Sequence, residues 1–290
     1  MKISNKKMVW TTAAVLVLIL IAIVLWKYLP ILQPNDPILI AIDPGHGGPG
    51  IEQGYQTIDG THECVMNNAV ANYLAEILTQ RGYDIVFTKE PVDTVYMSLD
   101  DRPAAANAAG ADIFISIHHD SNGYENPQGY RVFYSSYKVN LDSDDIVVLY
   151  NGKEYDLVSE RNEWDEEGDS YTIKTITDGT VSFEINSNED FYKIIDKTPC
   201  DAAADSEQLA NLIFDSMYSL EYIQPYSSER LSNVVDEEYR VLRYADMPAV
   251  LVEAGFMSNP QNSAAIQRSE NQLSLATAIA DAVDAYFSEE

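Results

Sequence analysis

The chain has 290 residues, enough for one large domain or two smaller ones with a hydrophobic core. It carries 18 basic and 46 acidic residues, a formal net charge of −28. Because nucleic-acid binding depends on clustered lysine and arginine, this charge excludes nucleic acid as a partner. Two cysteines, Cys64 and Cys200, are too few for a disulfide-stapled scaffold. One bridge between them stays open, and two ordinary thiols are the simpler interpretation.

Residues 1–29 are expected to form a cytoplasmic tip and a transmembrane anchor. Three lysines precede an uncharged run at 8–26, and Lys27 closes it. At about 1.5 Å per residue the run would span roughly 28 Å, the thickness of the bilayer core. The lysines before the run predict a cytoplasmic N-terminus, with the rest of the chain outside the cytoplasm. A cleavable signal peptide is the alternative, although its apolar region is usually shorter. Residues 30–36 are expected to form a linker.

Residues 37–289 predict one α/β domain around a central, mostly parallel sheet. Short apolar runs that predict strands alternate with helical amphipathic spacing, which is typical of this class. The predicted strands are 38–42, 83–88, 112–118, 129–135, 238–243 and 249–253. The predicted helices are 63–81, 98–109 and 205–220, with one or two more over 264–287.

A small, acidic, β-rich insertion at 138–204 is expected to interrupt this domain. Residues 138–205 hold 18 acidic and six basic side chains, a net charge of −12. Two β-hairpins are predicted, because Asn151-Gly152 and Asp178-Gly179 each lie between alternating runs and both residues of a type I′ turn need positive φ. The insertion would gate a groove or dock a protein partner; an inert decoration explains it equally well.

Polar side chains lie at the carboxyl ends of three predicted strands. His46 follows the first strand, His118 ends another, and Glu253 ends the last. Ligands of open α/β sheets bind beyond these ends, so the three side chains can converge there. Glu63, at the start of the first helix, belongs to the same rim. Two histidines and a carboxylate with an open fourth position are typical of catalytic zinc, so His46, Glu63 and His118 are the predicted metal ligands.

Glu253 is the candidate for the second carboxylate, which such a site needs to move the proton of the attacking water. A carboxylate at the end of an apolar strand costs energy unless something pairs with it. Each of the other residues has a plainer interpretation by itself. His46 could be a turn residue, Glu63 an acid that complements the helix dipole, and His118 a hydrogen-bonded strand end. Only the joint pattern is specific.

Three side chains next to the predicted ligands could also bind a metal. His119 should face away from His118, because side chains alternate along a strand. His62 would bind only if the loop before the helix folds differently. Cys64 should point about 100° away from Glu63 inside a helix, so we interpret it as a packing residue.

Four segments together resemble the zinc-dependent N-acetylmuramoyl-L-alanine amidases, also called type 3 amidases. They are 43–48, Glu63 with Asn67, 116–118 and 248–259. The resemblance covers about 37–137 and 205–287, and the acidic insertion lies outside it.

The resemblance implies an αβα domain with a mixed sheet and one zinc ion held by His46, Glu63 and His118. It implies Glu253 as the catalytic glutamate, and peptidoglycan as the substrate. The bond cut is then the amide between the lactyl group of N-acetylmuramic acid and L-alanine. An amidase-fold protein that binds muropeptides without turnover is one rival interpretation, and a zinc peptidase acting on peptide cross-links is another.

Two points of the resemblance are less direct. Arg102 matches an arginine that the family often carries, and a structural ion pair is its simplest role. The sequence of the loop 49–62 differs from the one usual in the family, which leaves Glu52 as an alternative to Glu63 as the carboxylate ligand. We prefer Glu63, because a helix with the matching Asn67 follows it.

Overall fold

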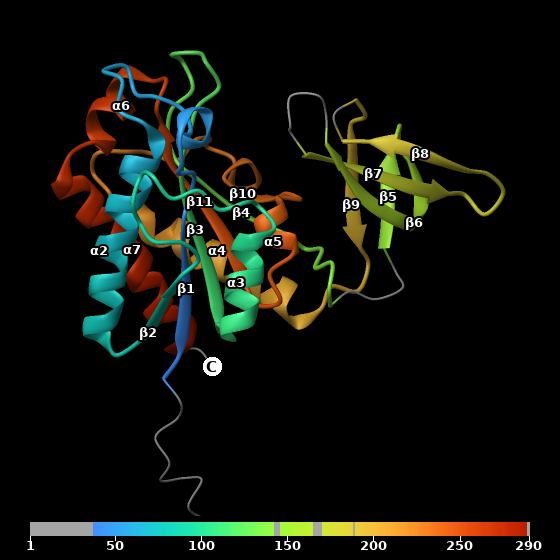
Figure 1. Cartoon of the computed structure of the whole chain (residues 1–290), viewed down its shortest axis with the longest axis horizontal. Helices are drawn as coiled ribbons and strands as arrows, with labels where there is room; N and C mark the ends of the chain where they lie inside the picture. The colour runs from blue at the N-terminus through green and yellow to red at the C-terminus, as the bar shows by residue number, and fades with distance from the viewer. Residues whose placement is uncertain (1–36, 142–145, 165–169, 188, 289–290) are drawn as a thin grey trace, which may run out of the picture. The chain divides into compact units, whose positions relative to one another are not determined.

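The computed structural model describes residues 37–141, 146–164, 170–187 and 189–288 (Figure 1). Residues 38–290 form a compact unit of their own. The predicted anchor at 8–26 and the linker at 30–36 lie outside the described residues. Within the described ranges, no helix has the length and apolar character needed to cross a membrane.

A six-stranded mixed sheet forms the centre of this unit, in the order β10-β4-β11-β3-β1-β2. Neighbouring strands run parallel except β11 and β4, which are antiparallel. The predicted α/β fold with a mostly parallel, mixed sheet is therefore confirmed. The strands are β1 (Leu39–Pro44), β2 (Asp84–Phe87), β3 (Ile113–Asp120), β4 (Arg131–Tyr134), β10 (Val234–Asp236) and β11 (Ala249–Phe256).

Helices cover both faces of this sheet. The larger core lies on the face covered by α2 (Glu63–Arg81), α4 (Asp201–Ser216) and α7 (Ser269–Ser288). A smaller core lies on the other face, where α3 (Asp101–Ala109) and the short α5 (Arg240–Arg243) pack. A further short helix, α6 (Pro260–Ile266), follows β11. Figure 1 shows α2 and α3 on opposite sides of β1.

The alternation of side chains along β3 and β11 decides which face carries the candidate site. Ile117 of β3 and Val252 of β11 point into the larger core. The next residues, His118 and Glu253, therefore point to the α3 and α5 side of the sheet. They are also paired neighbours, since Glu253 lies opposite His118 in the parallel register.

The predicted strand at 238–243 is wrong. The chain instead forms the one-turn helix α5, in which the N–H groups of Leu242 and Arg243 donate to the carbonyl oxygen of Tyr239. Val241 and Leu242 are consecutive, yet both pack in the smaller core. Strand side chains alternate between faces, so a strand would have exposed one of these two apolar residues.

The insertion forms a separate five-stranded antiparallel sheet, in the order β8-β7-β6-β5-β9. Both predicted hairpins are present. Asn151 and Gly152 have φ of 51° and 76°, as a type I′ turn requires. The second turn is longer, because Thr177 pairs with Ser182. The strands are β5 (Ile146–Tyr150), β6 (Lys153–Trp164), β7 (Ser170–Thr177), β8 (Ser182–Asn186) and β9 (Tyr192–Asp196).

An ionic cluster of two buried cations, Lys174 and Arg243, and two half-buried carboxylates, Glu160 and Glu238, joins this second sheet to α5. Oε2 of Glu160 on β6 lies 2.8 Å from Nζ of Lys174 on β7 and 2.9 Å from Arg243 on α5. Glu238 lies 3.4 Å from Lys174. Burial opposes ionisation of Glu160, but the charges of Arg243 and Lys174 hold its pKa below the usual value. Two buried cations thus balance two carboxylates.

We predict that Lys174→Met lowers the free energy of unfolding by about 3 kcal/mol, because removing one partner of a buried pair leaves a carboxylate under-compensated. Equilibrium urea unfolding measures this. The matched control is Lys153→Met on β6, which removes an exposed pair with Asp178 and should leave the stability nearly unchanged. Equal effects of the two substitutions would contradict a structural role for the ionic cluster.

Candidate metal centre

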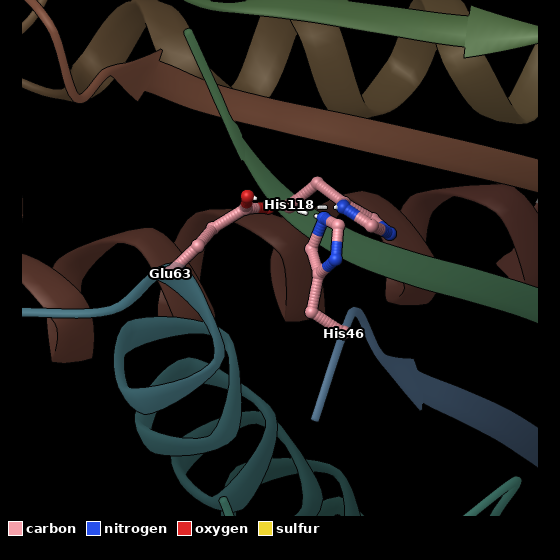
Figure 2. A group of neighbouring side chains, drawn as sticks. All are labelled: His46, Glu63 and His118. Atoms are coloured by element: carbon pink, nitrogen blue, oxygen red, sulfur yellow. Dashed lines mark hydrogen bonds and ion pairs between the residues drawn. The ribbon is translucent and has the colours of Figure 1, made fainter. Parts of the chain in front are cut away.

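Three side chains from three separate elements meet at the carboxyl edge of the central sheet. His46 lies in the loop after β1, Glu63 opens α2, and His118 lies on β3 (Figure 2). Oε2 of Glu63 is 3.1 Å from Nε2 of His46, and Oε1 is 3.0 Å from Nδ1 of His118. One ligand atom from each residue lies within 4.8 Å of the others. This is the group of residues that the sequence predicts as metal ligands.

The loop after β1 is shaped so that the two histidines can approach each other. His46 has φ of 59°, in the left-handed region that residues other than glycine rarely adopt. Gly45 precedes it, and a Cβ at Gly45 would lie 2.3 Å from the ring of His118. The ring centroids of His46 and His118 are 4.9 Å apart. Glycine at position 45 is therefore a steric requirement of the centre.

Glu63 is an ionised carboxylate in a buried position, with only 2% of its side chain exposed. Burial opposes ionisation, but hydrogen bonds with His118 and His46 outweigh it and lower the pKa of Glu63 well below 4.5. Burial also lowers the pKa of His118, which favours its neutral form. An ionised carboxylate and a neutral imidazole are the protonation states that bind a metal.

Asn67 and His119 hold the Glu63 carboxylate from behind. Nδ2 of Asn67 donates to Oε1 of Glu63 at 3.2 Å and to the carbonyl oxygen of Gly45 at 3.1 Å. The backbone N–H of His119 donates to the same Oε1 at 3.1 Å. Since Oδ1 of Asn67 can only accept, Nδ1 of His119 donates to it, at 2.8 Å. Such contacts fix the orientation of a metal ligand.

His119 therefore supports the centre rather than binding in it. It lies on the opposite face of β3 from His118, beside α2, and burial lowers its pKa to about 4. His62 lies just before α2 and accepts a hydrogen bond from Gln56 at 2.8 Å. Cys64 is buried, which raises its pKa to about 11. Neither His62 nor Cys64 belongs to the ligand cluster.

The structure also decides between Glu52 and Glu63, and it shows whether the two cysteines form a disulfide. Glu52 lies on the short helix η2 (Gly50–Gln53), where it is exposed and outside the ligand cluster. Glu63, not Glu52, is thus the carboxylate that approaches both histidines. Cys64 and Cys200 are not joined by a disulfide.

A buried network centred on Asp43 and Arg102 anchors the His46 loop. The guanidinium of Arg102 is 2.8 Å from Oδ1 of Asp43, the ion pair expected for this arginine. It also donates to the carbonyl oxygens of Pro44 at 3.0 Å and His46 at 3.2 Å. Burial alone would raise the pKa of Asp43. The charge of Arg102 and the hydrogen bonds that hydroxyl groups donate to Asp43 lower this pKa instead. The hydrogen bonds from Arg102 therefore hold the backbone of His46 in its left-handed conformation.

Glu253 lies beside the centre, and its carboxyl group differs from that of Glu63 in its pKa. Its Oε2 is buried and has no hydrogen-bond partner among the described residues. Burial, followed by the charges of Glu63 and Asp120, raises its pKa well above 4.5. A carboxyl group with a raised pKa is suited to accept and return a proton near neutral pH.

An ion pair next to Glu253 was not anticipated from the sequence. Arg131 of β4 lies opposite Glu253 in the sheet register and pairs with Asp120 at the end of β3. The positive charge of Arg131 opposes the rise in the pKa of Glu253. The feature of the sequence that could have indicated this ion pair is Asp120, a carboxylate two residues beyond His118.

The centre opens into a cleft of about 700 Å³ lined by His46, His118 and Glu253. Tyr96 and Tyr239 are among its other lining residues. This volume is in the range of sites that bind small molecules or segments of a polymer. The cleft provides room for a substrate beside the ligand cluster.

An α/β scaffold with a His–Glu–His cluster that could hold a metal, and with a carboxylate of raised pKa beside it, is typical of metal-dependent hydrolases. The N-acetylmuramoyl-L-alanine amidase profile matches residues 40–285. The chain therefore belongs to the N-acetylmuramoyl-L-alanine amidase family, whose substrate is the peptidoglycan of the cell wall, and it is an enzyme of that class.

Relatives of known sequence and structure agree with this assignment. The chain is 30% identical over 251 residues to the amidase AmiA of Escherichia coli K12, covering 86% of this chain and 76% of AmiA. The amidase Ami1 of Mycobacterium smegmatis shares the fold with a TM-score of 0.62 at 19% identity, over 89% of this chain and all of that one. An amidase of Clostridium difficile 630 matches with a TM-score of 0.58 at 21% identity, over 88% and 100%.

We predict that Arg102→Met weakens metal affinity by roughly 10- to 100-fold, because the loop that presents His46 loses its anchor. Competition with a chromophoric chelator measures the affinity. Arg81→Met, which removes exposed pairs with Asp281 and Asp284, is the control and should keep the parent affinity. Parent-like affinity in the folded Arg102 variant would contradict the anchoring role.

Proposed function

We propose that this amidase is zinc-dependent, with one zinc ion per chain held by His46, Glu63 and His118, and with Glu253 as its catalytic residue. The observation that carries the proposal is the convergence of three ligand atoms within 4.8 Å, directly beside Glu253 on the neighbouring strand. The substrate bond is the amide between the lactyl group of N-acetylmuramic acid and L-alanine in peptidoglycan.

The donor set fits zinc. Two imidazole nitrogens and one carboxylate oxygen leave a fourth tetrahedral position for water or substrate, as in catalytic zinc sites. The cleft touches both histidines, so that position would be open to solvent. A Cβ at Gly54 would lie 2.6 Å from Oε2 of Glu63, so the cradle around the carboxylate is also tight. A zinc ion supplies Lewis acidity, which acidifies water to a pKa of about 7 and polarises a carbonyl group.

Glu253 carries the proton in the proposed reaction. Its carboxylate takes the proton from the water that attacks the lactyl carbonyl carbon. It then returns that proton to the nitrogen of L-alanine, which leaves as a free amine. Its raised pKa suits both steps, because the group must accept a proton and then release it. The lactyl group is left as a carboxylate on the sugar.

Glu253→Gln is expected to lower hydrolysis at least 100-fold while leaving the zinc content unchanged, since the amide cannot carry the proton. The assay digests peptidoglycan with the purified zinc-loaded protein and counts newly freed L-alanine amino groups. Glu52→Gln is the matched control. It removes a carboxylate that also lines the cleft, and it should keep activity near that of the parent.

Three results would overturn parts of this proposal. Glu253→Gln activity within tenfold of the parent would remove the assigned role of Glu253. A parent protein that binds muropeptides without turnover would indicate a regulatory protein. Products in which the peptide cross-links are cut and the lactyl–alanine bond is intact would indicate a peptidase.

We also propose that residues 8–26 anchor the chain as a single membrane span and that residues 37–289 work outside the cytoplasm. The lysines flanking the apolar run support this orientation. The full chain should stay with membranes through an alkaline wash, and a variant lacking 8–26 should be released. A mature N-terminus beyond residue 26, found by mass spectrometry, would instead indicate a cleaved signal peptide.

A protein partner at the insertion 138–204 remains a proposal of lower rank. One structure of similar fold is the CwlD amidase of Clostridioides difficile in complex with the GerS lipoprotein, at a TM-score of 0.57. In the present chain, the insertion shares a hollow with the body of the domain, which favours a role in substrate binding.

A further inference from the structure

A second hollow, of about 370 Å³, lies between the insertion and the body of the domain. Its wall includes Tyr171 and Phe191 from the insertion. Leu99, Tyr239 and Arg240 line both this hollow and the cleft of the candidate metal centre. The two hollows therefore adjoin at these three residues, and together we call them the groove, which runs from the metal centre to the insertion.

The groove presents exposed apolar and aromatic side chains along its length. Leu99 and Tyr239 lie at the junction of the two hollows, and both are exposed. Phe191, just before β9, has 96% of its surface exposed, the largest value among the exposed large hydrophobic residues of the described chain. A phenylalanine ring exposed beside a hollow offers apolar surface that a ligand in the hollow can cover.

The wall that carries Phe191 is held in place. The ionic cluster of Glu160, Lys174, Glu238 and Arg243 joins the insertion to α5, and the backbone N–H of Ile194 donates to Glu238 at 3.1 Å. Next to Phe191, Asp190 accepts hydrogen bonds from Tyr150 at 2.7 Å and from the backbone of Asn186 at 2.8 Å. A groove with fixed walls can bind a ligand without a large ordering cost.

The negative charge of the insertion favours binding of the glycan strand of the proposed substrate over binding of its stem peptide. Residues 138–205 carry a net charge of −12, and Glu237 and Glu238 also line the groove. A stem peptide ends in a carboxylate, which this surface repels. The N-acetylglucosamine units of a glycan strand are neutral, and the flat apolar faces of their sugar rings stack on aromatic side chains while their hydroxyl groups hydrogen-bond to carboxylates.

We propose that the insertion extends the substrate groove and binds the glycan strand next to the muramic acid whose amide is cut, with Phe191 as its exposed stacking residue. The inference rests on the proposed function for the identity of the polymer. It assigns the insertion a direct part in substrate binding, which selects long glycan strands over isolated muropeptides.

The test uses the zinc-loaded full chain and Phe191→Ala, a substitution at an exposed position that should not disturb folding. A neutral, peptide-free hexamer of N-acetylglucosamine is the probe, and its affinity is measured by calorimetry. Loss of one stacking contact should weaken binding roughly three- to tenfold. Val181→Ala is the matched control, because Val181 is an apolar insertion residue, 60% exposed, in the turn between β7 and β8.

Activity provides the second readout. Phe191→Ala should lower hydrolysis of polymeric peptidoglycan by a similar factor and leave hydrolysis of a single-disaccharide muropeptide within about twofold of the parent. No binding of the hexamer to the parent, or equal binding by Phe191→Ala, would overturn the inference. Weakened binding of a free stem peptide alone would overturn the choice of glycan. Binding is measured without turnover, so failure of the proposed amidase reaction is recognised separately.

Discussion

The buried carboxylate of Glu63 is the constraint on which this edge of the molecule depends. A buried, ionised carboxylate is costly unless its oxygen atoms are satisfied. Here His46 approaches one oxygen, while His118, Asn67 and a backbone N–H approach the other. These groups come from the loop after β1, from α2 and from β3. The charge of one side chain therefore fixes the relative positions of three elements, and a metal ion placed there would complete the compensation.

The mixed sheet supplies the geometry that Glu63 needs. Because β1, β3 and β11 are parallel, their carboxyl ends lie at one edge, and side-chain alternation turns His118 and Glu253 to the same face. The two carboxyl groups then differ through their surroundings. Hydrogen bonds with His118 and His46 lower the pKa of Glu63, while burial raises the pKa of Glu253, whose Oε2 has no hydrogen-bond partner among the described residues. One is suited to hold a metal and the other to move a proton.

Residues with a strong local signal could be predicted from the sequence. The helix 63–81 matches α2, since its apolar spacing and the stop at Gly82 are local properties. The short α5 was missed, because four residues with two adjacent apolar side chains fit a strand or a helical turn equally well. The ionic cluster could not be predicted either. Its four charges come from two strands of the insertion, the loop before α5 and α5 itself, and their pairing exists only after the insertion has packed.

X-ray diffraction from crystals of the zinc-loaded protein, recorded above and below the zinc absorption edge, tests the central claim most directly. We expect one anomalous peak within about 2.0–2.3 Å of one nitrogen each of His46 and His118 and one oxygen of Glu63, with Glu253 close by but outside the coordination sphere. A peak bound by Glu52 or His62 in place of Glu63, or no peak between the two histidines, would contradict it.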